Sequence, residues 1–581
     1  MGTELKAGKH VRAVATKAVS LFASAALVLT LAPAVAPQRA SADDEAVSAS
    51  GTSGTCTWTL EDGVLTLSPT DGTSGTLAGN TSKTGAPWYD CYESITSVVV
   101  EDGVATSSEA AYLFNGLRYA ESIDVSGLDV SDATDVEGMF RICSNLTSVD
   151  VSGFDTSNVT DMNSLFINCS SLTAVIGLSG FDTSKVTDMS NMFGSCNALE
   201  EADVSGFDTS SVTSMGSMFV SDKALTKLDV SGFDTSKVTD MASMFSGCSS
   251  VTELDVSKFD TSRVTSFNSM FRGCSSLSSL DVSGFSTSRS TTFSSMFYGL
   301  SLVPELDVSG FSTGKASYLD NMFHNCLSVS ELDLSNFSIA NVYGMDGMFD
   351  GCTGLRTVKL GSSFGFYGDA CYLPAPVEDS TSGNWRASSG YVFDDPSDVP
   401  SYTADTYTAV FGEKTPLSKA TVKLSSSKLA YNGKARKPKV TVSIGGHTLK
   451  SGTDYTASYA SGSKNIGSYK VTVKGKGHYS GSVSKSYKVV PQATKVKKVT
   501  AGKRKVKVTL VSRKGGVKYQ VRYKVKGKKK WKTVTAKKAK VTLKKLKKGK
   551  KYLVQARTMK KVSGKTYTSS WSSSKVTKKV K

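Results

Sequence analysis

The sequence has few of the side chains that enzymes use for acid, base or metal chemistry. It contains 4 histidines in 581 residues, and only His324, His447 and His478 lie beyond the N-terminal segment. No His-Glu-x-x-His or phosphate-loop motif is present. A hydrolase with two catalytic carboxylates needs no such motif, but the carboxylates here follow a repeat and form no isolated pair. We therefore expect no enzyme activity and no resident cofactor.

Long apolar runs are also rare, and the clearest one lies near the N-terminus. Basic residues precede the run AVSLFASAALVLTL, and Ala-Ser-Ala at 40–42 precedes acidic residues. This order predicts a signal peptide over residues 1–42. An uncleaved anchor is the alternative, but the run is shorter than the roughly 20 residues that span a bilayer. We expect an exported protein with no membrane span after cleavage. Because no Leu-Pro-x-Thr-Gly sorting signal is present, we expect no covalent anchor either.

Acidic residues are nearly absent from the C-terminal part of the chain. Residues 417–581 hold 48 of the 69 Lys and Arg residues but one acidic residue, Asp454, which gives a net charge of +47. Residues 1–416 carry a net charge of −29. A single hydrophobic core stops growing beyond roughly 250 to 300 residues. The chain is therefore expected to form several domains of opposite charge.

What the sequence has in abundance is a repeat of 26 residues, with one interval of 27. It is marked by Phe114, Phe140, Phe166, Phe193, Phe219, Phe245, Phe271, Phe297, Phe323 and Phe349. Such a period is typical of a leucine-rich repeat solenoid. The triplet Leu254-Asp255-Val256 alternates as a short parallel strand does, and FDTSRVTSFNSMF predicts turns and a loosely helical outer side. We predict about ten stacked 26-residue turns that form a curved slab about 50 Å long.

The amino-acid sequence of the repeat also resembles that of a known family. The pattern MF-x-x-CSSL-x-x-LDVSGFDTSKVTDM is similar to that of the BspA-like leucine-rich repeat surface proteins of bacteria. The resemblance covers about residues 110–360, and it implies an exported adhesin that binds host matrix or other bacteria. CTWTLEDGVLTLSPTDGTSGTL looks like the N-terminal cap of that family, and the segment around Trp385 looks like its C-terminal cap. The predicted domains are a cap at 43–110, the solenoid at 111–360, and a second cap with a linker at 361–415.

Cysteine forms a column three residues after the repeat phenylalanine, at Cys143, Cys169, Cys196, Cys248, Cys274, Cys326 and Cys352. One interpretation is a small buried filler. The other is disulfide pairing between consecutive turns, whose Cα atoms would lie near 5 Å apart. The odd count and the interruptions at Leu117, Asp222 and Leu300 argue against the second, and no histidine shares the spacing for a metal site. Outside the column we expect a disulfide between Cys56 and Cys91, and Cys371 has no obvious partner.

An acidic column follows the outward side of the predicted strands. Its members are Asp124, Asp150, Asp203, Asp229, Asp255, Asp281, Asp307 and Asp333, joined two positions earlier by Glu253, Glu305 and Glu331. Like charges on adjacent strands are destabilising. One interpretation is a solvated face that prevents edge-to-edge association. The other is a concave ligand-binding surface for basic proteins or divalent cations such as calcium.

From about Ala420 the period changes to that of short antiparallel strands, as in KVTVSIGG and SYKVTVKGKG. Residues 416–491 resemble immunoglobulin-like modules of Gram-positive surface proteins. Residues 492–581 resemble a lysine-rich fibronectin type III sandwich. The segment that ends in Tyr552 is similar to that family's tyrosine corner, with Lys548 where proline is usual. We expect Trp571 in the last strand. The predicted fold class is thus a leucine-rich repeat solenoid followed by two all-β sandwich domains.

Lysines on the outward strand positions predict a strong positive field that exceeds what solubility requires. Such a field binds anionic polymers: wall teichoic acids, host glycosaminoglycans or extracellular DNA. Sequence-specific nucleic-acid binding is not expected, because the aromatics fit strand cores better than a base-stacking surface. Another alternative is that the basic tail folds back onto the acidic slab. The predicted polyanion-binding residues are Lys528, Lys529, Lys530, Lys544, Lys545, Lys547 and Lys548.

These observations predict a secreted protein that is associated with the cell surface or the cell wall. We expect an adhesin whose repeat slab binds host extracellular matrix or cell-surface proteins, and whose basic tail is held by anionic wall polymers. The alternative is a structural or self-associating envelope protein without a host ligand.

Overall fold

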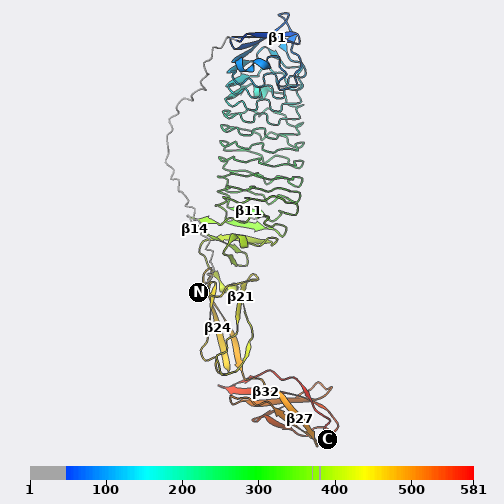
Figure 1. Cartoon of the computed structure of the whole chain (residues 1–581), viewed down its shortest axis with the longest axis vertical. Helices are drawn as coiled ribbons and strands as arrows, with labels where there is room; N and C mark the ends of the chain where they lie inside the picture. The colour runs from blue at the N-terminus through cyan, green and yellow to red at the C-terminus, as the bar shows by residue number, and fades with distance from the viewer. Residues whose placement is uncertain (1–46, 369–370, 379–380) are drawn as a thin grey trace, which may run out of the picture. The chain divides into compact units, whose positions relative to one another are not determined.

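The computed structural model describes residues 47–368, 371–378 and 381–581 (Figure 1). The predicted signal peptide at 1–42 lies outside the described residues. In the part of the chain that is described, no helix is both long enough and apolar enough to cross a membrane.

The N-terminal cap is an antiparallel meander that continues into the sheet of the repeats. β2 pairs with β1 and β3, β3 pairs in parallel with β5, and β5 pairs with β7. Trp58 and Trp88 lie edge to face in its core, with ring centroids 6.4 Å apart. The cap therefore covers the apolar end of the stack and supplies its first strand partner. The elements are β1 (Ala49–Ser53), β2 (Cys56–Glu61), β3 (Val64–Pro69), β4 (Gly75–Thr76), the 3-10 turn η1 (Tyr89–Ser94), β5 (Ser97–Val100), β6 (Val104–Ala105), β7 (Ser122–Asp124) and β8 (Leu128–Asp129).

The predicted disulfide between Cys56 and Cys91 is not formed, since both residues are free cysteines. Cys56 is buried on β2, and its Sγ faces β4, where it would lie 2.8 Å from a Cβ added to Gly75. Cys91 lies on η1 and is partly buried. Cys91 packs against the same core to which Cys56 belongs, and Cys56 serves the cap as a buried apolar group.

The repeat region is a stack of turns joined by parallel backbone pairing (Figure 1). Near the two ends of the stack, the segments that correspond to the Leu-Asp-Val triplet form strands. These are β9 (Ser148–Asp150), β10 (Ala174–Ile176), β11 (Glu331–Leu334) and β12 (Thr357–Leu360). The triplet Leu254-Asp255-Val256 has the predicted alternation of buried and exposed side chains but belongs to no strand. The most continuous pairing lies elsewhere, as parallel bridges from Glu109–Asp135 through Asp240–Ser266 to Tyr318–Gly344.

The segment before each repeat phenylalanine is a pair of turns and not the loosely helical stretch that its spacing predicts. Ser243, Ser269 and Ser295 have φ of 57°, 56° and 56°, which is the left-handed region and ends any helix. The Phe245 amide donates to the Met270 carbonyl of the next turn at 3.0 Å. Such amides donate to the next repeat of the stack and not to their own repeat. The outer side is therefore a second ladder of backbone hydrogen bonds between repeats.

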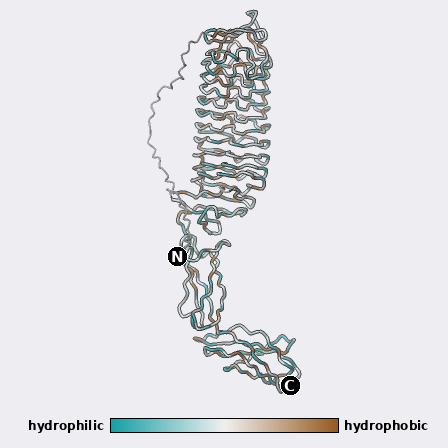
Figure 2. The backbone as a smooth tube through the Cα atoms, in the orientation of Figure 1, coloured by the Kyte–Doolittle hydropathy of each residue, from teal (hydrophilic) through white to brown (hydrophobic). Residues whose placement is uncertain are grey.

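The core of the repeat region is a continuous phenylalanine stack. Neighbouring repeat phenylalanines from Phe114 to Phe349 have ring centroids 5.4 to 6.1 Å apart and nearly parallel rings. Each turn therefore buries its apolar side mainly against its neighbours. Hydrophobic and hydrophilic segments alternate along the turns (Figure 2). The same core continues through both caps, from Cys56 to Tyr407.

The cysteine column lies beside this stack as buried free thiols. Each Sγ lies 2.9 to 3.2 Å from the carbonyl oxygen of the phenylalanine in the preceding turn and donates a weak hydrogen bond to it. This arrangement favours the filler interpretation. Asp222 takes the place of a cysteine and is fully buried, with Oδ1 accepting from the Cys196 amide at 2.8 Å. Oδ2 of Asp222 has no partner among the described residues.

The C-terminal cap ends the parallel stacking by adding an antiparallel neighbour. β12 pairs with β17, which pairs with β15 and then β16. Trp385 is fully buried, and its Nε1 donates to the Pro374 carbonyl at 2.8 Å. The elements are β13 (Val377–Glu378), β14 (Thr381–Ser382), β15 (Asn384–Ala387), β16 (Val392–Phe393) and β17 (Asp405–Val410).

Two β domains follow. In the first β domain, the sheets β19-β21-β22 and β20-β26-β24-β23 share one core that includes Val442, Val471 and Tyr487. The strands are β18 (Thr415–Pro416), β19 (Thr421–Leu424), β20 (Lys428–Ala430), β21 (Val440–Ile444), β22 (His447–Thr448), β23 (Tyr455–Tyr459), β24 (Gly467–Gly475), β25 (Tyr479–Ser480) and β26 (Ser482–Val490).

In the second β domain, the sheets β27-β28-β31 and β30-β29-β32-β33 share a core that includes Val508, Val521 and Val554. The Tyr552 hydroxyl accepts the Lys547 amide at 2.9 Å, which is the contact that a tyrosine corner requires. The strands are β27 (Val496–Gly502), β28 (Lys505–Leu510), β29 (Lys518–Val525), β30 (Lys532–Ala536), β31 (Lys540–Leu543), β32 (Tyr552–Val562), β33 (Lys565–Thr568) and β34 (Lys575–Val576).

Candidate binding surfaces

The eight aspartates of the acidic column, here called the acidic face, are held by their own turns. In each case the backbone amide two residues later donates to Oδ1 at 2.9 to 3.4 Å. The serine two residues later donates hydrogen bonds from its side chain and its backbone amide, and these lower the pKa of Asp150, Asp229 and Asp255 below the usual range. These carboxylates therefore stay ionised, with one oxygen used inside the turn.

Few of these charges are neutralised. Asp333 pairs with Lys359 at 2.7 Å, and Glu201 pairs with Lys227 at 3.0 Å. Among the described residues, the predicted Glu253, Glu305 and Glu331 and the remaining aspartates of the acidic face form no ion pair. Because one of its eight aspartates is paired, the acidic face keeps most of its negative charge. An exposed pair of this kind also contributes only about 0 to 1 kcal/mol.

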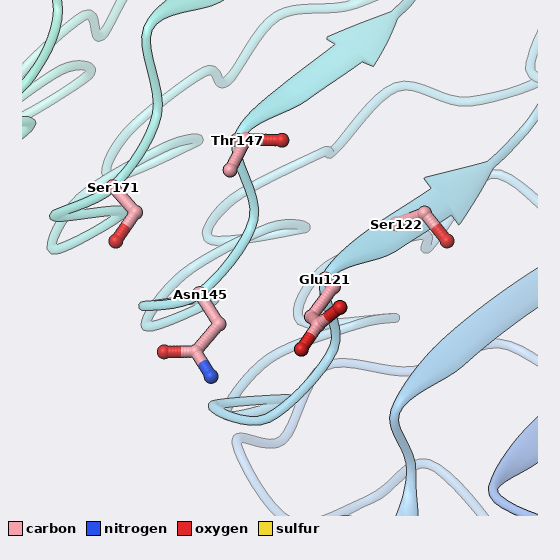
Figure 3. Close-up of a pocket in the computed structure, with 5 residues that line it drawn as sticks. All are labelled: Glu121, Ser122, Asn145, Thr147 and Ser171. Atoms are coloured by element: carbon pink, nitrogen blue, oxygen red, sulfur yellow. The ribbon is translucent and has the colours of Figure 1, made fainter. Parts of the chain in front are cut away.

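Two surface pockets lie between neighbouring turns on this side. The pocket in Figure 3 is lined by Glu121 and Ser122 of one turn and by Asn145, Thr147 and Ser171 of the next two. The other is lined by Asp203, Lys227, Asp229 and Glu253, among others. Their linings offer acidic and hydroxyl groups, which suit basic or hydrogen-bonding side chains. In the described part of the chain, no three His, Cys, Asp or Glu side chains converge as metal ligands.

A second acidic column on the bridge ladder was missed by the sequence reasoning. Glu109, Asp135, Asp161 and Asp188 pair through their backbones from turn to turn, and Asp240 follows in the same ladder after Ser214. Burial raises the pKa of Asp161 to about 6, and the neighbouring Asp188 and Asp135 act in the same direction. The recurring aspartate before methionine in the repeat was the available signal, but only the pairing shows that these carboxylates are stacked.

The seven predicted polyanion-binding lysines are brought together at one end of the second β domain, here called the lysine end. Lys528, Lys529 and Lys530 follow β29, and the other four precede β32. The end of β29 meets the start of β32, because Val525 pairs with Tyr552 and the Lys526 amide donates to the Lys551 carbonyl at 2.9 Å. All seven side chains are exposed. The grouping follows from strand register and joins two segments that are separate in sequence.

Sequence reasoning also missed a stack of cations and indoles on the outward face of the sheet that contains β29 and β32. Trp571 lies between β33 and β34, outside any strand, so its predicted place in the last strand is wrong. Its ring centroid lies 4.4 Å from Cζ of both Arg522 and Arg557. Trp531 lies 4.6 Å from Arg522 Cζ and 4.9 Å from Lys524 Nζ. These five residues are called the Trp–Arg stack.

Comparison with known families finds two matches. Residues 108–226, 175–276 and 273–360 match the family described as "Mycoplasma protein of unknown function, DUF285". This match supports the predicted BspA-like leucine-rich repeat character of that region. Residues 491–580 match "Cytokine receptor-like factor 2-like, D2 domain". Neither description names an enzyme.

Two solved structures are similar to parts of the chain. A leucine-rich repeat protein from Eubacterium ventriosum ATCC 27560 is 17% identical, with a TM-score of 0.26, and the match covers 53% of this chain and 90% of that one. Domains A168-A170 of titin are 16% identical, with a TM-score of 0.13, over 28% of this chain and 66% of that one. Such scores carry no argument about function. No curated protein matches the chain.

Proposed function

We propose that the chain is an exported surface protein of the adhesin kind. Its repeat region binds basic surfaces of host matrix or cell-surface proteins, and its second β domain holds it to anionic wall polymers. The observation that carries the proposal is the separation of charge: residues 417–581 have a net charge of +47, and residues 1–416 a net charge of −29.

The attachment of the second β domain to wall polymers, here called the tether, is supported by its charge and by its geometry. The lysine end gathers seven exposed cations, and residues 417–581 contain one acidic residue to neutralise them. Binding of a polyanion releases its condensed counterions, so the affinity falls steeply as salt rises. A wall-held protein with this arrangement needs neither a membrane span nor a covalent link.

The support for the repeat region as the ligand-binding part is the acidic face. Its carboxylates are preorganised by their turns, largely unpaired and exposed in several adjacent turns. A long row of fixed negative charges attracts a basic partner and raises the association rate.

The test is the binding of the whole chain to purified cell walls across a salt series, for the unaltered protein and for a variant with all seven lysines of the lysine end changed to glutamine. We expect steep salt dependence for the unaltered protein and a much shallower slope for the variant. Equal slopes would contradict the tether.

The opposite charges of the two parts also favour a second candidate, a self-associating envelope protein in which the basic part of one copy binds the acidic part of another. Sedimentation of the whole chain at low and high salt separates the two. Assemblies that dissolve as salt rises, together with no binding to host matrix, would favour this candidate.

A further inference from the structure

The Trp–Arg stack fixes three cations in one row. The order is Arg557, Trp571, Arg522, Trp531 and Lys524, and each cation lies 4.4 to 4.9 Å from an indole centroid. Stacking on an aromatic ring restricts a long basic side chain and holds its charge in place. The row is therefore far more rigid than the exposed lysines in the loops of the same domain.

The two guanidinium groups are oriented by glutamines on the neighbouring strand. Arg522 Nε donates to Gln555 Oε1 at 2.6 Å, and Arg557 Nε donates to Gln520 Oε1 at 2.7 Å. These contacts follow from the register in which Arg522 lies opposite Gln555, and Gln520 opposite Arg557. Within the described residues, the terminal Nη atoms of both arginines make no hydrogen bond. Each arginine thus presents its Nη donors to a ligand.

Among the residues that the structure describes, no carboxylate forms an ion pair with these three cations. The one acidic residue of 417–581, Asp454, lies in the first β domain, where its Oδ2 accepts the Lys450 amide at 2.6 Å. Burial and the positive charge of Arg522 lower the pKa of Arg557. Two cations around one indole without a counter-charge repel each other, and an anion placed between their Nη groups would remove that repulsion.

The indoles themselves are poorly placed to stack on bases or sugars. Trp571 has guanidinium groups of two arginines against its ring, and Trp531 has Arg522 and Lys524. A ligand therefore meets charged donors rather than a free aromatic face, which disfavours recognition by base stacking. The row also continues along β29 from Lys524 toward the lysine end.

We propose that the Trp–Arg stack is the anion-binding row of the second β domain and that its ligand is a wall polymer linked by phosphodiesters. This inference rests on the proposed wall tether and adds to it a defined site. Two oxygens of one phosphate match the paired donors of a guanidinium. Successive phosphates of the polymer bind at Arg557, Arg522 and Lys524, and the loop lysines add nonspecific attraction.

The test measures binding of the whole chain to poly(glycerol phosphate). Arg522→Gln with Arg557→Gln should weaken binding at least about tenfold, because two charge-assisted hydrogen-bonding sites are lost. The matched control, Lys537→Gln with Lys538→Gln, removes the same charge from the exposed turn that follows β30 at the opposite end of the sheet. It should weaken binding less than threefold. Arg522→Lys with Arg557→Lys keeps the charge but loses the paired donors, so it should resemble the glutamine variant.

A titration without any substitution keeps the proposal testable if the arginine variants fail to fold. Poly(glycerol phosphate) should change the tryptophan fluorescence of the unaltered chain, because Trp531 and Trp571 lie between the binding cations. Saturable binding with no change in emission would overturn the site. So would full binding by the Arg522→Gln, Arg557→Gln variant while the seven-lysine variant loses it, and that result would leave the wall tether intact.

Dextran sulfate and a single-stranded DNA oligonucleotide are the comparison ligands. Tighter binding to either of them than to poly(glycerol phosphate), lost in the arginine variants, would overturn the assignment to a phosphodiester wall polymer. Failure of the unaltered chain to bind either poly(glycerol phosphate) or purified walls would instead overturn the proposed tether itself, and the inference with it.

Discussion

The repeat region and the second β domain differ in whether their charged side chains are bound by other groups of the same chain. In the repeat region each aspartate of the acidic face is bound by its own turn, as in the bond from the Ser257 amide to Asp255 at 3.0 Å. In the second β domain the lysines of the lysine end have no acidic partner among the described residues. The first arrangement tolerates charge as part of the fold, whereas the second leaves charge available to a ligand.

The two regions also differ in what stabilises them. The repeat region depends on one column of phenylalanine rings shared by neighbouring turns. The second β domain depends on a small core between two sheets. A change in the column should therefore affect several turns, whereas a change in the sheets should stay local.

The largest expected effect tests this difference. Phe245→Ala removes a fully buried ring that stacks on Phe219 and Phe271 at 6.0 and 5.8 Å. We expect it to destabilise the repeat region by about 3 to 5 kcal/mol. Calorimetry of the whole chain should show the repeat transition lowered and the second β domain unchanged. Val534→Ala, at an exposed site on β30, is the control and should change stability by less than about 0.5 kcal/mol.

The next effect concerns Asp222, the charged residue inside the cysteine column. Burial raises its pKa well above the usual value, so the folded state binds this proton more tightly than the unfolded state. Stability should therefore fall as pH rises from the ordinary aspartate pKa toward the raised one. Asp222→Cys restores the usual residue and should add about 1 to 3 kcal/mol at pH 8 and less at pH 4. A variant no more stable at pH 8 would contradict the burial of this carboxyl.

A smaller effect is expected at the tyrosine corner of the second β domain. Tyr552→Phe leaves the Lys547 amide without its acceptor and should cost about 0.5 to 1.5 kcal/mol. Tyr523→Phe is the matched control, because the Tyr523 hydroxyl makes no hydrogen bond within the described residues. Thermal unfolding of the whole chain separates the two variants. Equal losses would show that the hydroxyl contact at Tyr552 contributes nothing.

The smallest effect is expected on the acidic face. Asp255→Asn keeps an acceptor for the Ser257 amide and removes one exposed charge, so the melting temperature at neutral pH should be unchanged within error. The hydrogen bonds from Ser257 lower the pKa of Asp255. Its small contribution is therefore present above the ordinary aspartate pKa and is lost as pH falls through the lowered value. A large destabilisation at neutral pH would mean that this face is structural.

The features that the sequence predicts are those with a fixed period. The repeat spacing, the buried phenylalanines and the buried cysteines follow from side chains that must meet their equivalents in the next turn. The second ladder was missed because it depends on serines at positive φ, such as Ser269, and serine seldom adopts that conformation. Periodicity alone suggested a helix there.

The candidate sites divide in the same way. The lysines of the lysine end are evident from composition, although strand register decides that they share one end. The Trp–Arg stack was missed because Trp571 and Arg522 lie far apart in the sequence and meet only through the pairing of β29 with β32 and the path of the chain after β33. Outward strand positions that alternate glutamine with arginine were the one local signal.

We propose that the acidic face binds host matrix and that the lysine end binds cell walls, each independently of the other. Two variants of the whole chain test it most directly: one with the seven lysines changed to glutamine, and one with Asp229, Asp255 and Asp281 changed to asparagine. Each is assayed for binding to purified cell walls and to host extracellular matrix. We predict that the first variant binds walls more weakly and with a much shallower salt dependence but keeps matrix binding, and that the second keeps wall binding but loses matrix binding. Loss of both activities in either variant would contradict the claim.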